Sequence, residues 1–255
     1  MMTTNLPLAG ERVLITGASS GLGAHFARLA VQAGASVVVA ARRKEALDAL
    51  VAELRAEGGE AQAQALDVTD SASVDALFSM LASALPTVVV NNAGMEPGVF
   101  SFMDLDEEGW DATLGTNLKG VWLMARAAAR AWRAAGQGGN LVNIASILAF
   151  RQQKGVTPYA VSKAGVVQLT KQIALEGARF GIRANALAPG YFRSAVSARL
   201  LDSPEAEAFL RAIPQRRAGT LEDYDGAFLL LAGAASAHMT GQVITVDGGH
   251  LVSTL

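Results

Sequence analysis

Apolar residues along the chain alternate between short continuous runs and segments with helical spacing. The continuous runs predict strands at residues 12–16, 36–41, 61–68, 87–91, 140–145, 182–188 and 243–246. Between them, apolar side chains recur every three or four residues, which is typical of helices with one buried face. Such spacing predicts helices from residue 22 to 33, around 47–54 and 74–81, and at 110–135, 159–180, 205–212 and 222–232.

Strict alternation of strand and helix predicts an α/β fold, in which a parallel sheet has helices on both faces. Ligands bind at the carboxyl ends of the strands in such sheets. With no internal repeat or linker, residues 1–255 are expected to form one domain. The more polar segment 191–218 is expected to act as a substrate-binding lid.

Composition narrows the function classes. The chain has 255 residues, a formal net charge of -2 and no cysteine. Charges of both signs are interspersed, so neither nucleic acid nor a membrane surface is an expected partner. The N-terminus has no signal-peptide pattern, and the apolar runs are shorter than the ~18 residues of a membrane span. These features predict a soluble, cytoplasmic protein.

Candidate chemistry is concentrated between Ser146 and Lys163. The Thr157-Pro158 pair predicts a helix start, with Thr157 as the cap and Pro158 in the first turn. Tyr159 and Lys163 are four residues apart, so they share one helix face. One cation about 4 Å away, at an effective dielectric of about 20, would lower the pKa of a phenol by roughly three units. We therefore expect Tyr159 to be a general acid made more acidic by Lys163, with Ser146 orienting the substrate.

A glycine-rich turn joins the first predicted strand to the first predicted helix. It reads Thr16-Gly-Ala-Ser-Ser-Gly-Leu-Gly23. Backbone N–H groups and the positive end of the helix dipole would bind a diphosphate there, although a simple tight turn would also need glycine. The candidate contacts in this turn are Gly17, Ser19, Ser20, Gly21, Leu22 and Gly23.

The second predicted strand ends in Arg42-Arg43, with no acid before Glu45. A carboxylate there would favour NAD, whereas arginine offers charge-assisted donors to the 2′-phosphate of NADP. We therefore expect NADP(H) to be preferred over NAD(H), with Arg42 a better candidate than Arg43. For Arg43, a solvated helix start is as good an interpretation.

Two further clusters follow strand ends. Asn91, Ala93 and Gly94 lie in an Asn-Asn-Ala-Gly sequence, and Asp67 follows the third strand. Each could contact the cofactor or simply form a turn.

Taken together, these motifs resemble the short-chain dehydrogenase/reductase family, and in particular its NADP-preferring ketoreductases and 3-oxoacyl-carrier-protein reductases. The ordered set covers nearly the whole chain: Thr16-Gly-x-x-x-Gly-x-Gly23, Asp67, Asn91-Asn-Ala-Gly94, Asn117, Ser146, Tyr159-x-x-x-Lys163, Pro189-Gly190 and Asp247-Gly-Gly249. The resemblance implies a doubly wound Rossmann-like fold, three layers deep (α/β/α), with a seven-stranded parallel sheet.

The resemblance also implies roles for individual residues. The catalytic tetrad would be Asn117, Ser146, Tyr159 and Lys163, where Asn117 holds a water and Lys163 also binds the nicotinamide ribose. Adenine contacts would lie at Asp67 and Val68, and nicotinamide contacts at Pro189, Gly190 and Phe192. Ser194 stands where a Thr often binds the nicotinamide carboxamide, and it keeps the hydroxyl for that cofactor contact. Thr87 stands where the fourth strand often begins with Asp.

The resulting hypothesis is an NADP(H)-dependent oxidoreductase that reduces a small-molecule ketone, reversibly, to a secondary alcohol. Substrate walls are expected at 95–100, 147–153 and 191–217, with Ile147, Leu148, Tyr191 and Phe192 favouring an apolar or aromatic ketone. The alternatives are an epimerase or dehydratase on the same fold, or a dinucleotide-binding sensor. The resemblance suggests a homotetramer, or a homodimer, with Trp122 and Trp132 on a subunit interface. The three histidines have no metal-ligand spacing, so no metal is expected.

Overall fold

The computed structural model describes residues 6–96, 98–193, 201–203 and 206–253. Within these residues the strands are β1 Arg12–Thr16, β2 Ser36–Ala41, β3 Ala61–Ala65, β4 Val88–Asn91, β5 Gly139–Ile144, β6 Ile182–Pro189 and β7 Val243–Val246. They form a seven-stranded sheet in the described part of the chain, in the order β3-β2-β1-β4-β5-β6-β7. Every neighbouring pair is parallel. The predicted fold class is confirmed.

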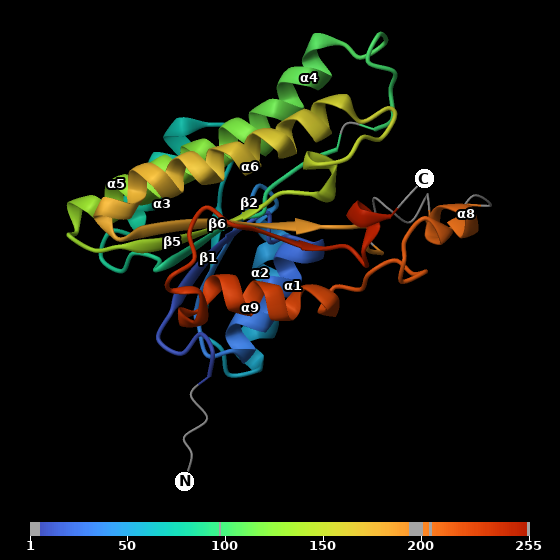
Figure 1. Cartoon of the computed structure of the whole chain (residues 1–255). Coiled ribbons are helices and arrows are strands. Elements are labelled where there is room, and N and C mark those ends of the chain that lie inside the picture. The colour runs from blue at the N-terminus through green and yellow to red at the C-terminus, as the bar shows by residue number, and fades with distance from the viewer. Residues whose placement is uncertain (1–5, 97, 194–200, 204–205, 254–255) are drawn as a thin grey trace.

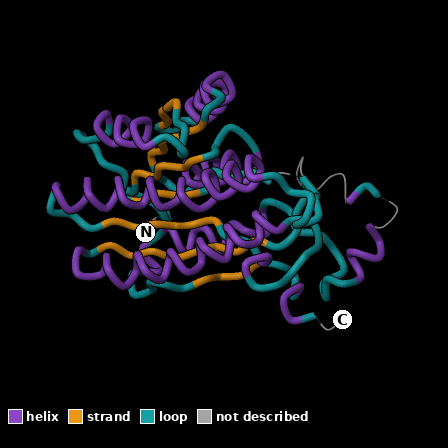
Figure 2. The backbone as a smooth tube through the Cα atoms, turned by 90° about the horizontal axis from the view of Figure 1, so that it is seen from above, coloured by secondary structure: helices purple, strands orange, loops and turns teal. Residues whose placement is uncertain are grey.

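Helices cover both faces of this sheet. The described helices are α1 Gly21–Gln32, α2 Lys44–Ala56, α3 Ser71–Met80, α4 Glu107–Leu114, α5 Gly120–Ala134, α6 Thr157–Gly177, α8 Ala206–Arg211 and α9 Asp225–Ala232. Figure 1 shows α3, α4, α5 and α6 on one side of the sheet and α1, α2 and α9 on the other. Seen from above, the helices run alongside the strands, and the short α8 lies apart from them (Figure 2). The three-layer arrangement is the one expected.

The strand order places a switch point beside β1. β2 and β3 lie on one side of β1, while β4 to β7 follow on the other. The helices that follow β1 and β4 therefore cover opposite faces of the sheet. A crevice forms between the carboxyl ends of those two strands. The glycine turn after Thr16 and the segment after Asn91 both begin at this edge.

Each face of the sheet has its own apolar core. On the side of α1, the ring of Phe26 stacks on that of Phe228, with centroids 4.2 Å apart. On the side of α5, the Trp132 side chain is fully buried, and its indole N–H donates to the carbonyl oxygen of Pro86 at 2.7 Å. The prediction that Trp132 faces another subunit is therefore wrong. Trp122 is 42% exposed and lies under the Arg126 guanidinium.

Two predicted elements differ in extent. β3 ends at Ala65 rather than Val68, because the carboxylate of Asp67 accepts hydrogen bonds from the backbone and side chain of Thr69 and turns the chain. The single long helix expected at 110–135 is interrupted by the π-helical turn Gly115–Lys119 between α4 and α5. A glycine at each end of this turn region lowers the helix propensity there.

Thr87, at the position before β4 where the resemblance suggested that an acid is frequent, makes stabilising contacts. Its hydroxyl accepts the backbone N–H of Arg12 at 3.0 Å and donates to the carboxylate of Glu11 at 2.5 Å. Thr87 thus links the Glu11 carboxylate to the start of β1. In the part of the chain that the structure describes, no helix is both long and apolar enough to cross a membrane.

Candidate active site

The candidate acid Tyr159 lies in the first turn of α6. This helix begins at Thr157, and its N-cap residue is Val156, which makes no side-chain capping bond. Thr157 is thus the first helical residue rather than the cap, so that detail of the prediction is wrong. Pro158 follows in the first turn, where its missing N–H removes no helical hydrogen bond.

Lys163 lies one turn further along α6, against Tyr159. Its ammonium nitrogen is 5.6 Å from the centre of the Tyr159 ring and donates to the carbonyl oxygen of Ile144 at 2.8 Å. The Lys163 side chain is almost fully buried, and this burial lowers its pKa to about 8. The predicted proximity of the two residues is confirmed.

The pKa of Tyr159 is shifted upward, whereas a downward shift was expected from the sequence. Burial raises it to about 12, the Ser146 hydroxyl lowers it through a hydrogen bond, and the negative charge of Glu96 raises it further. The prediction of a lowered pKa is therefore wrong for this arrangement. The physical reason is that desolvation of a phenolate outweighs a neighbouring cation that is hydrogen-bonded to a carbonyl oxygen instead of the phenol.

Ser146 follows the end of β5 and is buried. Its hydroxyl oxygen accepts the backbone N–H of Leu148 at 3.1 Å and so caps the short 3₁₀ turn Ile147–Ala149. Because the cap fixes the Ser146 side chain, its hydroxyl lies beside the phenol of Tyr159. Ser146, Tyr159 and Lys163 thus converge at one place on the carboxyl edge of the sheet.

Asn117 lies in the middle of the π-helical turn and is fully buried. Its side-chain oxygen accepts the backbone N–H of Met95, and its amide nitrogen donates to the carbonyl oxygen of Met95, both at 2.8 Å. The same nitrogen donates to the hydroxyl of Ser162 at 3.3 Å. Asn117 therefore binds the loop after β4 to α6, a contact that the sequence did not predict.

The glycine turn between β1 and α1 is packed closely against the end of β4. A Cβ on Gly17 would lie 2.7 Å from the Cα of Ala93, and one on Gly23 would lie 2.5 Å from the amide nitrogen of Asn92. Gly17 also has a φ of +67°, which side chains rarely adopt. The backbone of the glycine turn lies close to the segment after β4, and the side-chain amide of Asn92 donates to the carbonyl oxygen of Thr16 at 2.9 Å.

The N-terminus of α1 carries no side-chain cap. Ser20 precedes Gly21, the first residue of the helix, and makes no capping hydrogen bond. Leu22 points into the core, whereas a Cβ on Gly21 would have open space around it. The N–H groups of the first turn therefore have no side-chain partner and lie beside open space. Such groups can bind an anionic ligand.

Both candidate arginines follow β2 and are exposed, but they differ in their partners. The guanidinium of Arg43 donates to the hydroxyls of Ser19 at 3.0 Å and Ser20 at 3.2 Å, which places it on the glycine turn. The positive charge of Arg42 instead contributes to the lowered pKa of Asp67, after the larger effect of hydrogen bonds from Thr69. The sequence favoured Arg42, yet Arg43 is the arginine joined to the turn.

The segment after β4 has a buried and an open part. The Asn91 side chain is buried, and its amide donates to Asn143 at 2.8 Å, while its oxygen has no partner among the described residues. The backbone N–H of Ala93 donates to the Thr16 hydroxyl at 3.0 Å. Gly94 is exposed, and a Cβ on it would lie 3.8 Å from the Lys163 nitrogen. Gly94 therefore lies beside the ammonium group of Lys163.

On the opposite wall, Val68 and the end of β6 shape the crevice. Val68 is buried against Gly120, since a Cβ added to Gly120 would lie 2.9 Å from the Val68 side chain. Pro189 is the last residue of β6, and a Cβ on Gly190 would lie 2.7 Å from Asp247. Phe192 is partly buried, with its ring 5.4 Å from that of Tyr224. Ser194 lies outside the described residues.

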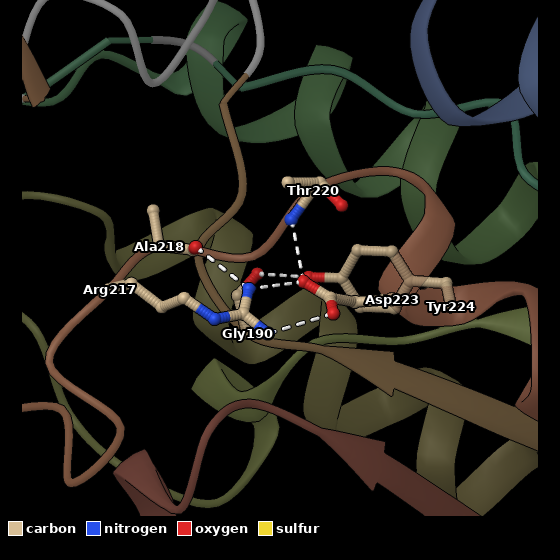
Figure 3. A network of polar contacts seen from close by, with 6 residues as sticks. All are labelled: Gly190, Arg217, Ala218, Thr220, Asp223 and Tyr224. Atoms are coloured by element: carbon tan, nitrogen blue, oxygen red, sulfur yellow. Dashed lines mark hydrogen bonds and ion pairs between the residues drawn. The ribbon is translucent and has the colours of Figure 1, made fainter.

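A polar network fixes the segment 217–224 beside this strand end (Figure 3). Arg217 donates two hydrogen bonds to the carboxylate of Asp223, at 2.5 and 2.9 Å, and Asp223 also accepts the backbone N–H of Thr220 at 2.8 Å. The Tyr224 hydroxyl lies 3.5 Å from the carbonyl oxygen of Gly190, to which it donates. The end of the predicted lid is thus tied to the carboxyl edge.

The substrate walls are only partly as expected. Ile147 and Leu148 are buried, so these two side chains belong to the packed interior instead of an open wall. Tyr191 is half-buried and donates to the side chain of Gln153. Its ring lies 4.6 Å from that of Phe209 on α8 and 5.8 Å from that of His250. This aromatic contact between three distant segments had no signal in the sequence pattern.

Among the described residues there is no group of three or more His, Asp or Glu side chains that could bind a metal ion. His25 instead pairs with Asp225, with 2.6 Å between Nε2 and the carboxylate oxygen.

Comparison with known proteins identifies the family. The family profile described as enoyl-(acyl carrier protein) reductase matches residues 17–250. Gluconate 5-dehydrogenase of Gluconobacter oxydans is 35% identical, with 96% of each chain covered. The 3-oxoacyl-(acyl-carrier-protein) reductase of Thermotoga maritima is 36% identical, with 96% of this chain and 99% of the relative covered.

The comparison with solved structures supports the same family. A gluconate 5-dehydrogenase from Burkholderia cenocepacia in complex with NADP and tartrate has a TM-score of 0.93 and 34% identity, with 98% of both chains covered. The chain therefore belongs to the short-chain dehydrogenase/reductase family, whose members are NAD(P)-dependent oxidoreductases acting on alcohol or carbonyl groups.

Proposed function

We propose that this protein is an NADP(H)-dependent ketone reductase, working reversibly, with Tyr159 as the general acid and base. The observation that carries the proposal is the convergence of three side chains: the Ser146 hydroxyl lies close enough to the Tyr159 phenol to lower its pKa, and the Lys163 nitrogen lies 5.6 Å from the Tyr159 ring centre. They lie at the carboxyl edge of a parallel sheet, where substrates of such folds bind.

The crevice beside β1 has the features that a dinucleotide requires. The uncapped N-terminus of α1 and the open space at Gly21 suit a diphosphate, and exposed Gly94 leaves room above Lys163. Asp67, which follows β3, and Pro189, the last residue of β6, lie on opposite sides of the crevice. When bound, the nicotinamide would supply or accept the hydride at the carbonyl carbon.

The preference for NADP(H) would come from the two arginines after β2. Both are exposed at the rim of the crevice, and Arg43 is already bonded to Ser19 and Ser20 of the glycine turn. An arginine fork binds a phosphate through parallel charge-assisted hydrogen bonds. Structures of similar proteins contain NADP, including the Burkholderia cenocepacia enzyme, which supports the same preference here.

Tyr159 would donate its proton to the oxygen that becomes an alcohol. A phenol with a pKa near 12 is fully protonated at neutral pH, and it remains a stronger acid than the alcohol that it forms. Ser146 would hydrogen-bond the same substrate oxygen and orient it. Lys163, with a pKa near 8, would replace the proton on Tyr159, and Asn117 would place a water between Lys163 and solvent.

We infer an apolar or aromatic ketone as the substrate, because the ring of Tyr191, which lies close enough to Tyr159 for their charges to interact, packs against that of Phe209. Related proteins are named for different substrates: gluconate in one case and 3-oxoacyl-carrier protein in another. Comparable turnover on polyols, with none on hydrophobic ketones, would contradict this inference.

We further propose that residues 1–255 act as one catalytic domain in which 191–218 covers the substrate. Assembly as a homotetramer, or as a homodimer, stays a prediction, as does a cytoplasmic location. The exposed Trp122 on α5 is the tryptophan that could still lie on an interface.

A panel of ketones and secondary alcohols, assayed with NADPH, NADH and their oxidised forms, tests the function. Steady consumption of NADPH with a ketone supports the reductase. Chemical change of a substrate without net cofactor consumption would instead favour an epimerase or dehydratase, and tight binding without any turnover would favour a sensor. Chiral analysis of the product would then define the face of attack.

A further inference from the structure

Glu96 lies at the rim of the candidate active site, on a loop whose path is fixed. Asn117 binds both backbone groups of the preceding residue, Met95, through two hydrogen bonds of 2.8 Å. On the other side of Met95, a Cβ on Gly94 would lie 3.4 Å from the Asn117 oxygen and 3.8 Å from the Lys163 nitrogen. The chain at Gly94 and Met95, directly before Glu96, therefore passes beside Asn117 and Lys163.

The carboxylate of Glu96 is not neutralised by a neighbour. It forms no ion pair with any residue in the described part of the chain. Its negative charge acts on two phenols, Tyr159 and Tyr191, and raises the pKa of each. Although the residue is exposed, its carboxyl group is partly surrounded by protein, which raises its own pKa. An incompletely hydrated charge acts more strongly on a ligand than one in bulk water.

The positive groups near the site already have backbone partners. The Arg151 guanidinium donates to the backbone carbonyl of His250, and its charge acts on Tyr191 and His250. Lys163 donates to the carbonyl of Ile144. Around the phenol of Tyr159, the rim charge that acts on the reacting group is thus the negative one of Glu96.

We propose that Glu96 is a specificity-determining residue that disfavours substrates with a negative charge next to the reacting carbonyl, and favours neutral or cationic ones. This inference rests on the proposed ketone reduction at Tyr159. A carboxylate beside the carbonyl would be brought close to the Glu96 carboxylate, and juxtaposed like charges are strongly unfavourable in an interface.

A matched pair of ketones tests the proposal: 2-oxo-4-phenylbutanoate and its ethyl ester, which share the reacting carbonyl and the phenyl group. We expect the wild type to prefer the ester. In Glu96→Gln, the ratio of kcat/KM for ester over acid should fall by at least about tenfold, because one like-charge contact is removed. Glu96→Asp keeps the charge and should keep most of the preference. Glu108→Gln, on the exposed first turn of α4, should leave the ratio unchanged.

A second readout is the pH dependence of ester reduction. Since the Glu96 charge raises the pKa of Tyr159, Glu96→Gln should move the alkaline limb of the profile to lower pH. The other charged or titratable groups facing Tyr159 or Tyr191, namely Lys163, Arg151 and His250, are unchanged in this variant.

The outcomes separate the two proposals. An ester-to-acid ratio equal in the wild type and Glu96→Gln overturns the role of Glu96 while leaving ketone reduction intact. A wild-type enzyme that prefers the acid over the ester also overturns the role of Glu96. This measurement needs no variant, so the test does not depend on how well a variant folds. Reduction of neither compound by the wild type, with no other ketone accepted, overturns the proposed function and this inference together.

Discussion

The ammonium nitrogen of Lys163 lies 5.6 Å from the ring centre of Tyr159, while the hydrogen bond that it donates goes to the carbonyl of Ile144. In the proposed mechanism, the pair would therefore divide the proton chemistry. Tyr159, with a pKa raised to about 12, retains its proton until a stronger base forms beside it. Lys163, with a pKa lowered to about 8, exchanges its proton near neutral pH.

Tyr159→Phe removes only the hydroxyl at the reacting position. We expect kcat for ketone reduction to fall about a hundredfold to ten-thousandfold, which is the usual contribution of a positioned acid. NADPH binding, measured by fluorescence titration, should change little because the ring remains. Retention of activity would refute the assignment of Tyr159.

Ser146→Ala removes the hydrogen bond that lowers the pKa of Tyr159. Alcohol oxidation requires the phenolate, so its rate rises with pH, and a higher phenol pKa moves that rise to higher pH. We expect this upward displacement together with a lower kcat. Ser79→Ala, an exposed serine on α3, serves as the control. An unchanged profile with lower kcat would mean that Ser146 acts on the substrate alone.

Arg42→Ala and Arg43→Ala should differ in their effects on the two cofactors. Loss of Arg42 should weaken NADPH by at least about tenfold and NADH little, since a charge-assisted bond to the phosphate is removed. Loss of Arg43 should also weaken NADH, because Arg43 supports Ser19 and Ser20 in the glycine turn. Arg179→Ala, remote from the turn, controls for overall charge. Equal losses of both cofactors in Arg42→Ala would assign phosphate recognition to another group.

Lys163→Met should change how stability depends on pH. Burial lowers the pKa of Lys163 from 10.5 to about 8, so between these values the unfolded chain binds more protons than the folded one. By linkage, this group makes folding more favourable as pH rises through that window. The unfolding free energy of the wild type, relative to Lys163→Met, should thus rise by roughly 2 kcal/mol between pH 7 and pH 10. Urea denaturation at both pH values measures it, and a constant difference would contradict the assigned burial.

The alternation of strands and helices was predictable because burial on both faces leaves near-continuous apolar runs. Val88, Val89 and Val90 of β4 are all buried, as such a run indicates. The orientation of α5 could also have been predicted, although the expectation for Trp132 missed it. Arg126, Arg130 and Arg133 recur at helical spacing with Trp122 on one face, whereas Trp132 shares the buried face with Val121, Met124 and Ala128.

In the active site, the sequence identified residues that come together through regular elements. Tyr159 and Lys163 meet because both lie on α6, and Ser146 joins them because β5 and α6 are neighbours. The contributions of Glu96 and His250 arise from loops that are distant in sequence, and no periodicity brings loops together. The pKa of Tyr159 was also beyond the sequence, because it depends on how much water reaches the phenol and on a carboxylate from another loop.

The π-helical turn Gly115–Lys119 makes the active site sensitive to the length of one helix. Each residue advances an α-helix by about 100°, so a wide turn absorbs one residue without rotating the helix after it. Deleting a single residue here would restore a regular helix and leave Trp132 against Pro86, but it would remove the wide turn that directs the Asn117 side chain to Met95. Insertions and deletions in this turn should therefore be far less tolerated than substitutions on the exposed surface of the same helix.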